Sequence, residues 1–307
     1  MPLAPEIKAF LDAAAQAALP QVWEAPIEVI RRNTQSRPAL AGSPEQLFEI
    51  RNRFIPGPTA DLPIRIYRPQ AKTDRTIIYF HGGGWVLNFL DIYDASLSRL
   101  ANQSSATIIS VNYQKAPEHP FPIPFDDCYA TLLWVLENSA ELNVKTSHIG
   151  VAGDSAGANL AAAVALKARD HNIPLAFQLL VYPCIDRDFE TDSYRKNSTG
   201  YALSTQAMRW FWEQYLQDDE HHVNPYAVPA IAQDFTNLAP AIVITAEFDP
   251  LLSDGEKYAQ LLQRDGVQTS YRRFDGMIHG FFTNMAVTPV ASQAIDFVAN
   301  EIIRLTP

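Results

Sequence analysis

The sequence predicts an α/β protein with a doubly wound, mostly parallel sheet. Short apolar runs suited to buried strands alternate along the chain with helical patterns, and two glycine clusters directly follow two of these runs. The chain has 307 residues, of which 47% are hydrophobic and 19% charged, so it has ample apolar material for a large core. We therefore expect one main body with an insertion rather than two independent domains.

The first part of the chain, residues 1–45, is predicted to be a helical arm. Spacings of three and four separate its apolar residues and give one apolar stripe, formed by Ile7, Phe10, Leu11, Ala14 and Ala18. Such a stripe must pack against another part of the protein. The arm is therefore expected to lie on the body, which occupies residues 46–307.

The sheet is expected to start at residues 62–68, where apolar residues alternate with others up to Pro69. Further apolar runs are typical of buried parallel strands, at 76–80, 107–111, 149–152, 177–182, 242–246 and 270–274. Helical patterns separate most of them, at 129–136, 157–169, 258–262 and 295–305. This alternation is what predicts the doubly wound sheet.

A segment at about 186–235 interrupts the alternation and is interpreted as an inserted cap. It is polar at first and then aromatic through Trp210, Phe211, Trp212 and Tyr215. Because Trp210 and Trp212 point to different faces of a helix, we expect at least one of these aromatic residues to face a pocket. Packing of the helix onto the body is an equally good explanation for any single one of them.

Composition and charge exclude several classes of function. The net charge is −10, and the sequence has no basic run longer than two residues with which to bind a phosphate backbone. Nucleic acid is therefore excluded as a partner. The acidic balance also disfavours strongly anionic substrates and leaves neutral small molecules as the easiest class. The two cysteines, Cys128 and Cys184, form neither a disulfide framework nor a C-x-x-C motif, and we expect both to be buried thiols.

The N-terminal sequence predicts a cytoplasmic protein. It lacks a positively charged region, and Asp12 and Gln16 break the apolar stretch at 9–19, so we expect no signal peptide. No run approaches the ~20 apolar residues that span a bilayer. The sequence leaves the oligomeric state open, and a homodimer is one of the states that it permits.

The first chemical motif is G-x-S-x-G at residues 153–157, with Ser155 at its centre. It follows the predicted strand at 149–152 and begins the helix at 157–169. A strand, a sharp turn and a helix in this order form the nucleophile elbow of α/β hydrolases. The small neighbours let the turn tighten until the serine hydroxyl projects, and the helix N-terminus favours developing negative charge.

The second motif is the run from His81 to Trp85, which follows the strand at 76–80 and contains three consecutive glycines. Acyl transfer puts negative charge on the former carbonyl oxygen, and we expect the backbone N–H groups of Gly82, Gly83 and Ala156 to bind it. A phosphate-binding loop is the competing interpretation, but the run lacks both G-x-G-x-x-G spacing and a Walker lysine.

Serine needs a base, and His279 is the best candidate. It lies in a glycine-flanked loop after the strand at 270–274, at the edge of the sheet where α/β active sites lie. The chain order serine, acid, histidine leaves only three others, His171, His221 and His222, of which the first ends a helix and the other two lie in the cap.

The acid that orients this histidine is predicted to be Asp249. It follows the strand at 242–246, and Pro250 fixes the turn after it. Asp254 and Asp275 are its competitors. The first is explained as an ordinary helix N-cap, and the second is too close to His279 along the chain.

With both glycine motifs, the Asp-Pro turn and the His-Gly-Phe loop in this order, the chain resembles the bacterial branch of the hormone-sensitive-lipase-like carboxylesterases. Four further stretches match that family, at 116–122, 158–160, 181–183 and 249–251, whereas Gln114, Lys115 and Ser253 depart from it. The resemblance implies an α/β-hydrolase fold with an eight-stranded sheet, and a helical cap built from the N-terminal arm and the insertion. It also implies a structural role for His81.

The resemblance further implies a serine carboxylesterase that hydrolyses esters of short to medium acyl chains through an acyl-enzyme, without a cofactor or metal. Trp85, Trp210, Phe211 and Trp212 are candidate substrate-binding residues. Two alternatives stay open. The same triad could hydrolyse an amide, lactone or carbamate, and relatives without catalysis use the pocket as a small-molecule receptor, although those lack a triad residue.

Overall fold

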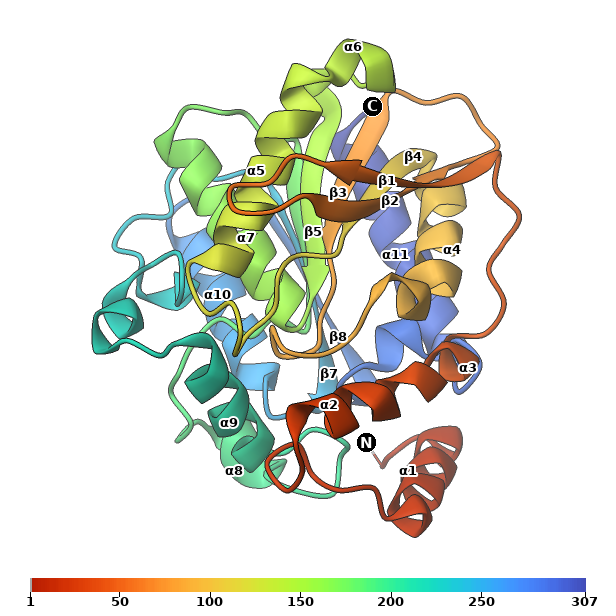
Figure 1. Cartoon of the computed structure of the whole chain (residues 1–307), viewed down its shortest axis with the longest axis vertical. Coiled ribbons are helices and arrows are strands. Elements are labelled where there is room, and N and C mark those ends of the chain that lie inside the picture. The colour runs from red at the N-terminus through yellow and green to blue at the C-terminus, as the bar shows by residue number, and fades with distance from the viewer. Residues whose placement is uncertain (1) are drawn as a thin grey trace.

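The computed structural model describes residues 2–307 and contains an eight-stranded sheet with helices on both faces (Figure 1). The strand order is β1-β2-β4-β3-β5-β6-β7-β8; β1 and β2, and β2 and β4, pair antiparallel, and the other pairs are parallel. The predicted mostly parallel, doubly wound sheet is therefore confirmed. The strands are β1 (Glu49–Ile55), β2 (Leu62–Arg68), β3 (Arg75–Phe80), β4 (Ala106–Val111), β5 (Ile149–Asp154), β6 (Phe177–Val181), β7 (Ala241–Phe248) and β8 (Thr269–Ile278).

The sheet starts one strand earlier than the sequence predicts, so the expected start at residue 62 is wrong. Strand β1 is an edge strand that pairs only with β2, and of its residues only Ile55 is buried. An edge strand that covers little of the core needs no alternating apolar pattern. Period-two alternation therefore could not reveal it.

Two layers of helices cover the sheet and divide the core between them. Helices α5, α7 and α10 contribute to the cluster on one face, and α4 and α11 to the cluster on the other. Their bounds are α4 (Asp94–Ser104), α5 (Ile123–Glu137), α6 (Ser139–Leu142), α7 (Ala156–Asp170), α10 (Leu252–Arg264) and α11 (Pro289–Leu305).

Helix α4 is absent from the sequence prediction because its buried face is partly polar. Ser96, Ser98 and Ser104 are all buried. Their hydroxyls donate to backbone carbonyl oxygens three or four residues earlier in the chain. Serine that satisfies its hydroxyl in this way can be buried without belonging to an apolar stripe.

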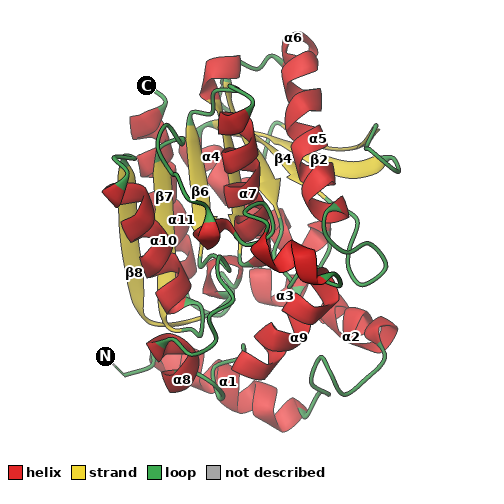
Figure 2. Ribbon diagram, turned by 90° about the vertical axis from the view of Figure 1, so that its left-hand side faces the viewer, coloured by secondary structure: helices red, strands yellow, loops and turns green. Residues whose placement is uncertain are grey.

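Two further groups of helices lie at the same end of the sheet (Figures 1 and 2). One group belongs to the N-terminal arm and the other to the insertion, and we call residues 2–45 and 186–235 the cap segments. Their α-helices are α1 (Pro5–Ala17), α2 (Ile27–Asn33), α3 (Pro38–Ala41), α8 (Asp192–Lys196) and α9 (Thr205–Tyr215).

The arm consists of short helices rather than one long one. Helix α1 ends where Ala18 takes a left-handed conformation, and α2 and α3 begin beside prolines. Of the stripe predicted for α1, only Ile7 is fully buried. Within residues 2–307, no helix is both long and apolar enough to cross a membrane. Cys128 and Cys184 are buried free thiols, as expected.

Candidate active site

Ser155 occupies a sharp turn between β5 and α7. Its φ of 55° and ψ of −123° lie in a region that non-glycine residues rarely adopt, and its N–H donates to the carbonyl oxygen of Val181 at 2.9 Å. Strain of this kind persists only where the surroundings enforce it, and it is typical of functional sites. The turn brings the Ser155 hydroxyl to the C-terminal edge of the sheet, in front of the N-terminus of α7.

The glycines on either side of Ser155 are required by close approach of the backbone. A Cβ on Gly153 would lie 2.2 Å from the carbonyl oxygen of Gly157, and a Cβ on Gly157 would lie 2.0 Å from that of Phe80. Any larger residue would push the elbow away from β3. The G-x-S-x-G spacing therefore follows from how tightly the strands and the helix pack at this point.

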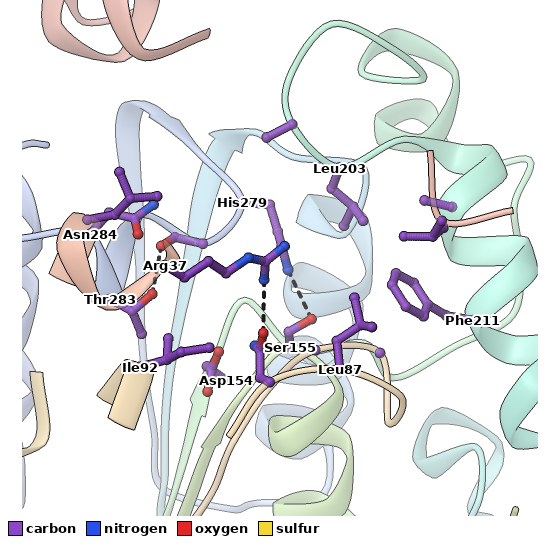
Figure 3. Close-up of a pocket in the computed structure, with 18 of the residues that line it drawn as sticks. Arg37, Leu87, Ile92, Asp154, Ser155, Leu203, Phe211, His279, Thr283 and Asn284 are labelled. Atoms are coloured by element: carbon purple, nitrogen blue, oxygen red, sulfur yellow. Dashed lines mark hydrogen bonds between the residues drawn. The ribbon is translucent and has the colours of Figure 1, made fainter. Parts of the chain in front are cut away.

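The structure brings together the three residues that the sequence selects as serine, histidine and acid. The Nε2 atom of His279 lies 2.9 Å from Ser155 Oγ, and its Nδ1 atom lies 2.7 Å from Asp249 Oδ2. Asp249 and His279 follow β7 and β8, which are neighbouring parallel strands. The ends of β5, β7 and β8 therefore hold the three side chains in one hydrogen-bonded chain. Figure 3 shows the bond between His279 and Ser155.

Asp249 is fully buried and fixed by further hydrogen bonds. Its Oδ1 atom accepts from the N–H of Leu251 at 2.9 Å, and its carbonyl oxygen accepts from Asn197 Nδ2 at 3.0 Å. A carboxylate held in this way can keep the imidazole in one orientation and one tautomer.

Neither competitor of Asp249 reaches His279. Asp275 is exposed and binds Arg273. Asp254 is buried in the third position of α10, and its Oδ2 accepts from the N–H groups of Ile185 and Asp186. The expectation that Asp254 caps its own helix is therefore wrong, because this carboxylate ties the start of the insertion to α10.

The glycine loop after β3 differs from the prediction in which N–H groups are available. The N–H of Gly82 donates to Asp154 Oδ1 and to the Tyr93 hydroxyl, both at 2.9 Å, so Gly82 cannot serve as an oxyanion donor. Gly83 and Gly84 line the pocket instead, with φ values of 113° and 61°. Among residues 2–307, the structure gives no hydrogen-bond acceptor to the N–H groups of Gly83, Gly84 or Ala156.

Asp154 holds the glycine loop in place through its side-chain carboxylate. Besides the Gly82 N–H, it accepts hydrogen bonds from the hydroxyls of Tyr79 at 3.0 Å and Tyr93 at 3.2 Å. Burial raises the pKa of the Asp154 carboxyl to about 6, and these hydrogen bonds oppose the shift. One buried carboxyl therefore fixes both the residue before the nucleophile and the first glycine of the loop.

His81 is packed inside the protein rather than at the reaction centre. Its Nδ1 atom lies 2.8 Å from the carbonyl oxygen of Gly82, and its ring stacks on Tyr113 with 4.4 Å between the centroids. Burial, and to a lesser extent the charge of Lys115, lowers the pKa of the imidazole to about 3. His81 is therefore neutral at physiological pH, which agrees with the structural role implied by the family resemblance.

A pocket of about 240 Å³ opens above Ser155 and His279. Both cap segments contribute to its wall. The N-terminal arm supplies Phe10, Gln21, Val22, Arg37 and Leu40, and the insertion supplies Ala202, Leu203, Ala207, Met208 and Phe211.

Of the four aromatic residues proposed for substrate binding, only Phe211 lines this pocket. Trp85 and Trp212 are buried against each other, with 4.5 Å between the ring centroids, and Trp210 packs edge-on against Phe211. Trp85 also stacks flat on Tyr215. The expectation is thus wrong for the three tryptophans. Trp85 and Trp212 join the glycine loop to α9, and Trp210 packs partly buried against the core.

Several residues of the pocket are missing from the sequence prediction. Arg37, Asn88, Ile92 and Thr283 belong to no motif and come from separate elements. Asn88 carries the only local signal, because asparagine tolerates its left-handed φ of 70° in the loop that follows the glycines. Arg37 lies in a polar stretch where nothing in the sequence distinguishes it.

Comparison with known proteins gives close relatives over nearly the whole chain. A family model described as alpha/beta hydrolase fold matches residues 77–283. An arylesterase of Saccharolobus solfataricus is 36% identical over 283 residues, covering 92% of each chain, and carboxylesterase NlhH of Mycobacterium tuberculosis is 39% identical over 277 residues, covering 87% of this chain and 86% of its own. The solved structure of ester-hydrolase EH1AB1 from the metagenome of Lake Arreo has a TM-score of 0.94 at 35% identity and covers 98% of both chains. The chain thus belongs to the α/β-hydrolase fold family, and its resemblance to the hormone-sensitive-lipase-like esterases is confirmed.

Proposed function

We propose that this protein is a serine carboxylesterase that hydrolyses esters of short to medium acyl chains. The observation that carries the proposal is the hydrogen-bonded chain Ser155–His279–Asp249 at the floor of the pocket. In this proposal Ser155 is the nucleophile, His279 is the general base, and Asp249 stabilises the imidazolium without accepting its proton. The arylesterase and carboxylesterase relatives support the same activity.

The oxyanion donors in this mechanism are the N–H groups of Gly83, Gly84 and Ala156. Two observations support this set over one that includes Gly82: Asp154 and Tyr93 already occupy the Gly82 N–H, and Gly83 and Gly84 line the pocket. Donors fixed by a loop and a helix N-terminus need no rearrangement when charge develops on the substrate oxygen. Each such donor is worth about 3 kcal/mol of transition-state stabilisation.

The reaction has two halves that use the same groups. His279 takes the Ser155 proton as Oγ attacks the ester carbonyl, and it returns that proton to the departing alcohol to leave an acyl-enzyme. Water, activated by the same imidazole, then attacks the acyl carbonyl. Collapse of the second tetrahedral intermediate releases the acid and regenerates the Ser155 hydroxyl.

The cap segments set the size of the substrate in this proposal. A pocket of about 240 Å³ lies just below the range of ~300–1,000 Å³ that is typical of sites for drug-sized ligands. A short or medium acyl chain fits such a space better than a long one. Phe211 supports this limit, because its ring packs directly over Gly84, where a Cβ would lie 2.1 Å from Phe211 Cδ1.

Steady-state hydrolysis of p-nitrophenyl esters, from acetate to palmitate, tests the function. We expect activity on the shorter chains, and a loss on the order of 10⁶ in kcat for a folded Ser155→Ala variant. Far-UV circular dichroism and the thermal midpoint of both proteins serve as the folding control. Folded wild-type protein without activity on any chain length would contradict the proposal and favour an amide, lactone or carbamate hydrolase.

A cytoplasmic location and a homodimeric state complete the proposal. The buried free thiols Cys128 and Cys184 support a reducing compartment. The edge strand β1 and the residue before it expose Phe48, Ile50 and Phe54, which supports association with a second copy. Subcellular fractionation tests the first statement, and sedimentation equilibrium tests the second.

A further inference from the structure

Arg37 stands out among the charged groups of the active-site pocket. It lies between a short 3-10 helix (Thr34–Ser36) and α3, and its side chain extends into the pocket toward Ser155 and His279 (Figure 3). Its Nη1 atom donates to Asn88 Oδ1 at 3.0 Å. Within residues 2–307, the structure records no ion pair between Arg37 and a carboxylate.

A second arginine of the same arm shows what a structural arginine looks like here. Arg31 forms a bidentate ion pair with Glu118, and it also donates to the backbone carbonyl oxygens of Val86 and Ala116. Those contacts engage most of its N–H groups with protein acceptors. Among residues 2–307, the Arg37 side chain has only the hydrogen bond to Asn88, so most of its donors are left for the pocket and for solvent.

The acidic groups near the pocket do not neutralise Arg37. Asp154 is engaged by Gly82, Tyr79 and Tyr93, and Asp249 is engaged by His279 and the Leu251 N–H. Arg37 lines the pocket but is also exposed to solvent, and an arginine remains charged in a protein. The pocket therefore contains an uncompensated cation, although the whole chain carries a net charge of −10.

The two walls of the pocket differ in chemical character. Ala207, Met208 and Phe211 of α9, together with Leu203, form an apolar wall. The polar residues Arg37, Thr283 and Asn284 lie on the opposite side, beside Ile92 (Figure 3), and Arg37 donates to Asn88. A guanidinium matches the geometry of a carboxylate and can bind it through two parallel N–H bonds.

We propose that Arg37 forms an anion subsite, so that the preferred substrate is an ester with one apolar arm and one arm that carries a carboxylate. This proposal rests on the proposed carboxylesterase activity. It differs from the expectation that an acidic chain disfavours anionic substrates. A cation that lines the pocket acts on the bound substrate more strongly than distant surface carboxylates, because salt screens those carboxylates.

The test compares charged and neutral substrates of the same shape in wild type and Arg37→Gln. One pair is mono-p-nitrophenyl adipate and p-nitrophenyl hexanoate, which differ by a carboxylate on the acyl arm. The other pair is 4-acetoxybenzoate and phenyl acetate, which differ by a carboxylate on the alcohol arm. For at least one pair we expect Arg37→Gln to raise KM for the charged ester about 10- to 100-fold, as for loss of a charge-assisted hydrogen bond, and to change the neutral ester less than about threefold.

Arg32→Gln is the matched control. It removes the same charge from the same arm, and Arg32 is exposed like Arg37 but does not line the active-site pocket. This variant should leave both pairs unchanged, which separates local binding from a general effect of net charge. Arg37→Lys keeps the charge and should retain part of the preference.

Two results would overturn the subsite. If Arg37→Gln lowers kcat equally for charged and neutral esters, Arg37 merely supports Asn88 and the glycine loop. If wild type shows no loss of kcat/KM for either charged ester between about 0.02 and about 0.5 M sodium chloride, no unpaired cation binds them, and this holds even if Arg37→Gln fails to fold.

The subsite and the carboxylesterase activity can fail separately. Hydrolysis of the neutral esters without charge preference removes only the subsite. If no ester is hydrolysed, calorimetric titration of adipate into Ser155→Ala, with and without Arg37→Gln, still tests the subsite. Tighter binding of adipate when Arg37 is present supports it, and equal binding contradicts it.

Discussion

The C-terminal edge of the sheet and the cap segments meet in one pocket, but they are built in different ways. At the edge, Ser155, Asp249 and Asp154 are all buried, and each is fixed by hydrogen bonds to backbone or side-chain partners. In the cap segments the helices are short, and the Arg37 side chain has a single hydrogen-bond partner among residues 2–307. The edge is therefore suited to chemistry, which needs fixed geometry, and the cap segments to substrate selection.

This difference explains which parts can change independently. In the proposed mechanism, a change at the sheet edge alters the groups that handle the proton and the oxyanion, so it should affect every ester alike. A change in the cap segments alters what fits beside Ser155, so it affects some esters more than others. Measuring one neutral substrate series and one charged series for each variant therefore separates the two regions.

The largest effect is expected at the edge, for Asp249→Asn. This variant should lower kcat about 10⁴-fold with little change in fold, because an amide holds the His279 imidazole in the wrong tautomer. The control is Asp275→Asn, which removes an exposed carboxylate near His279 in sequence but bound to Arg273. Steady-state kinetics on p-nitrophenyl butyrate should show near wild-type kcat for the control. Equal losses in both variants would contradict the assignment of Asp249.

The next prediction compares substitutions of two neighbouring residues on α9. Trp212 is buried against Trp85, so Trp212→Ala should lower the free energy of unfolding by about 3–5 kcal/mol and leave the acyl-chain profile unchanged. Phe211 lines the pocket, so Phe211→Ala should raise kcat/KM for longer acyl chains relative to acetate by about tenfold, as expected for added apolar space.

Urea unfolding and the p-nitrophenyl ester series measure both quantities for both variants. A changed chain-length profile in Trp212→Ala, with none in Phe211→Ala, would reverse the assignment of the pocket wall.

The sequence could predict most of the edge because local rules determine it. The G-x-S-x-G turn, the glycine loop and the loops of Asp249 and His279 each follow a buried strand, and parallel strands end at one edge. Alternation of apolar runs with helical stripes was sufficient to predict seven of the eight strands. It missed β1, which covers little of the core, and helix α4, whose serines satisfy their hydroxyls within the helix.

The remaining errors arise from contacts between residues distant in sequence. No pattern near Gly82 shows that Asp154, 72 positions later, takes its N–H group. No pattern near Trp85 shows that Trp212 and Tyr215 cover its ring. Arg37 can be recognised as a candidate anion-binding residue only from the structure, which shows that no carboxylate within residues 2–307 pairs with it. The proposed selectivity depends on such contacts, so it is the part that sequence predicts least.

The last prediction concerns the carboxyl that supports the glycine loop. Burial raises the pKa of Asp154 to about 6 from 3.8, so between these values the folded state binds a proton that the unfolded state has lost. This group therefore lowers stability as pH rises through that window, by up to about 3 kcal/mol for a shift of about two units. Asp154→Asn cannot titrate, so its stability relative to wild type should improve by up to this amount from about pH 4 to about pH 7. Urea unfolding of both proteins across this range measures the difference, in which the titrations of all other groups cancel. A difference independent of pH would show that Asp154 has an ordinary pKa, and that the glycine loop rests on a carboxylate already ionised in mild acid.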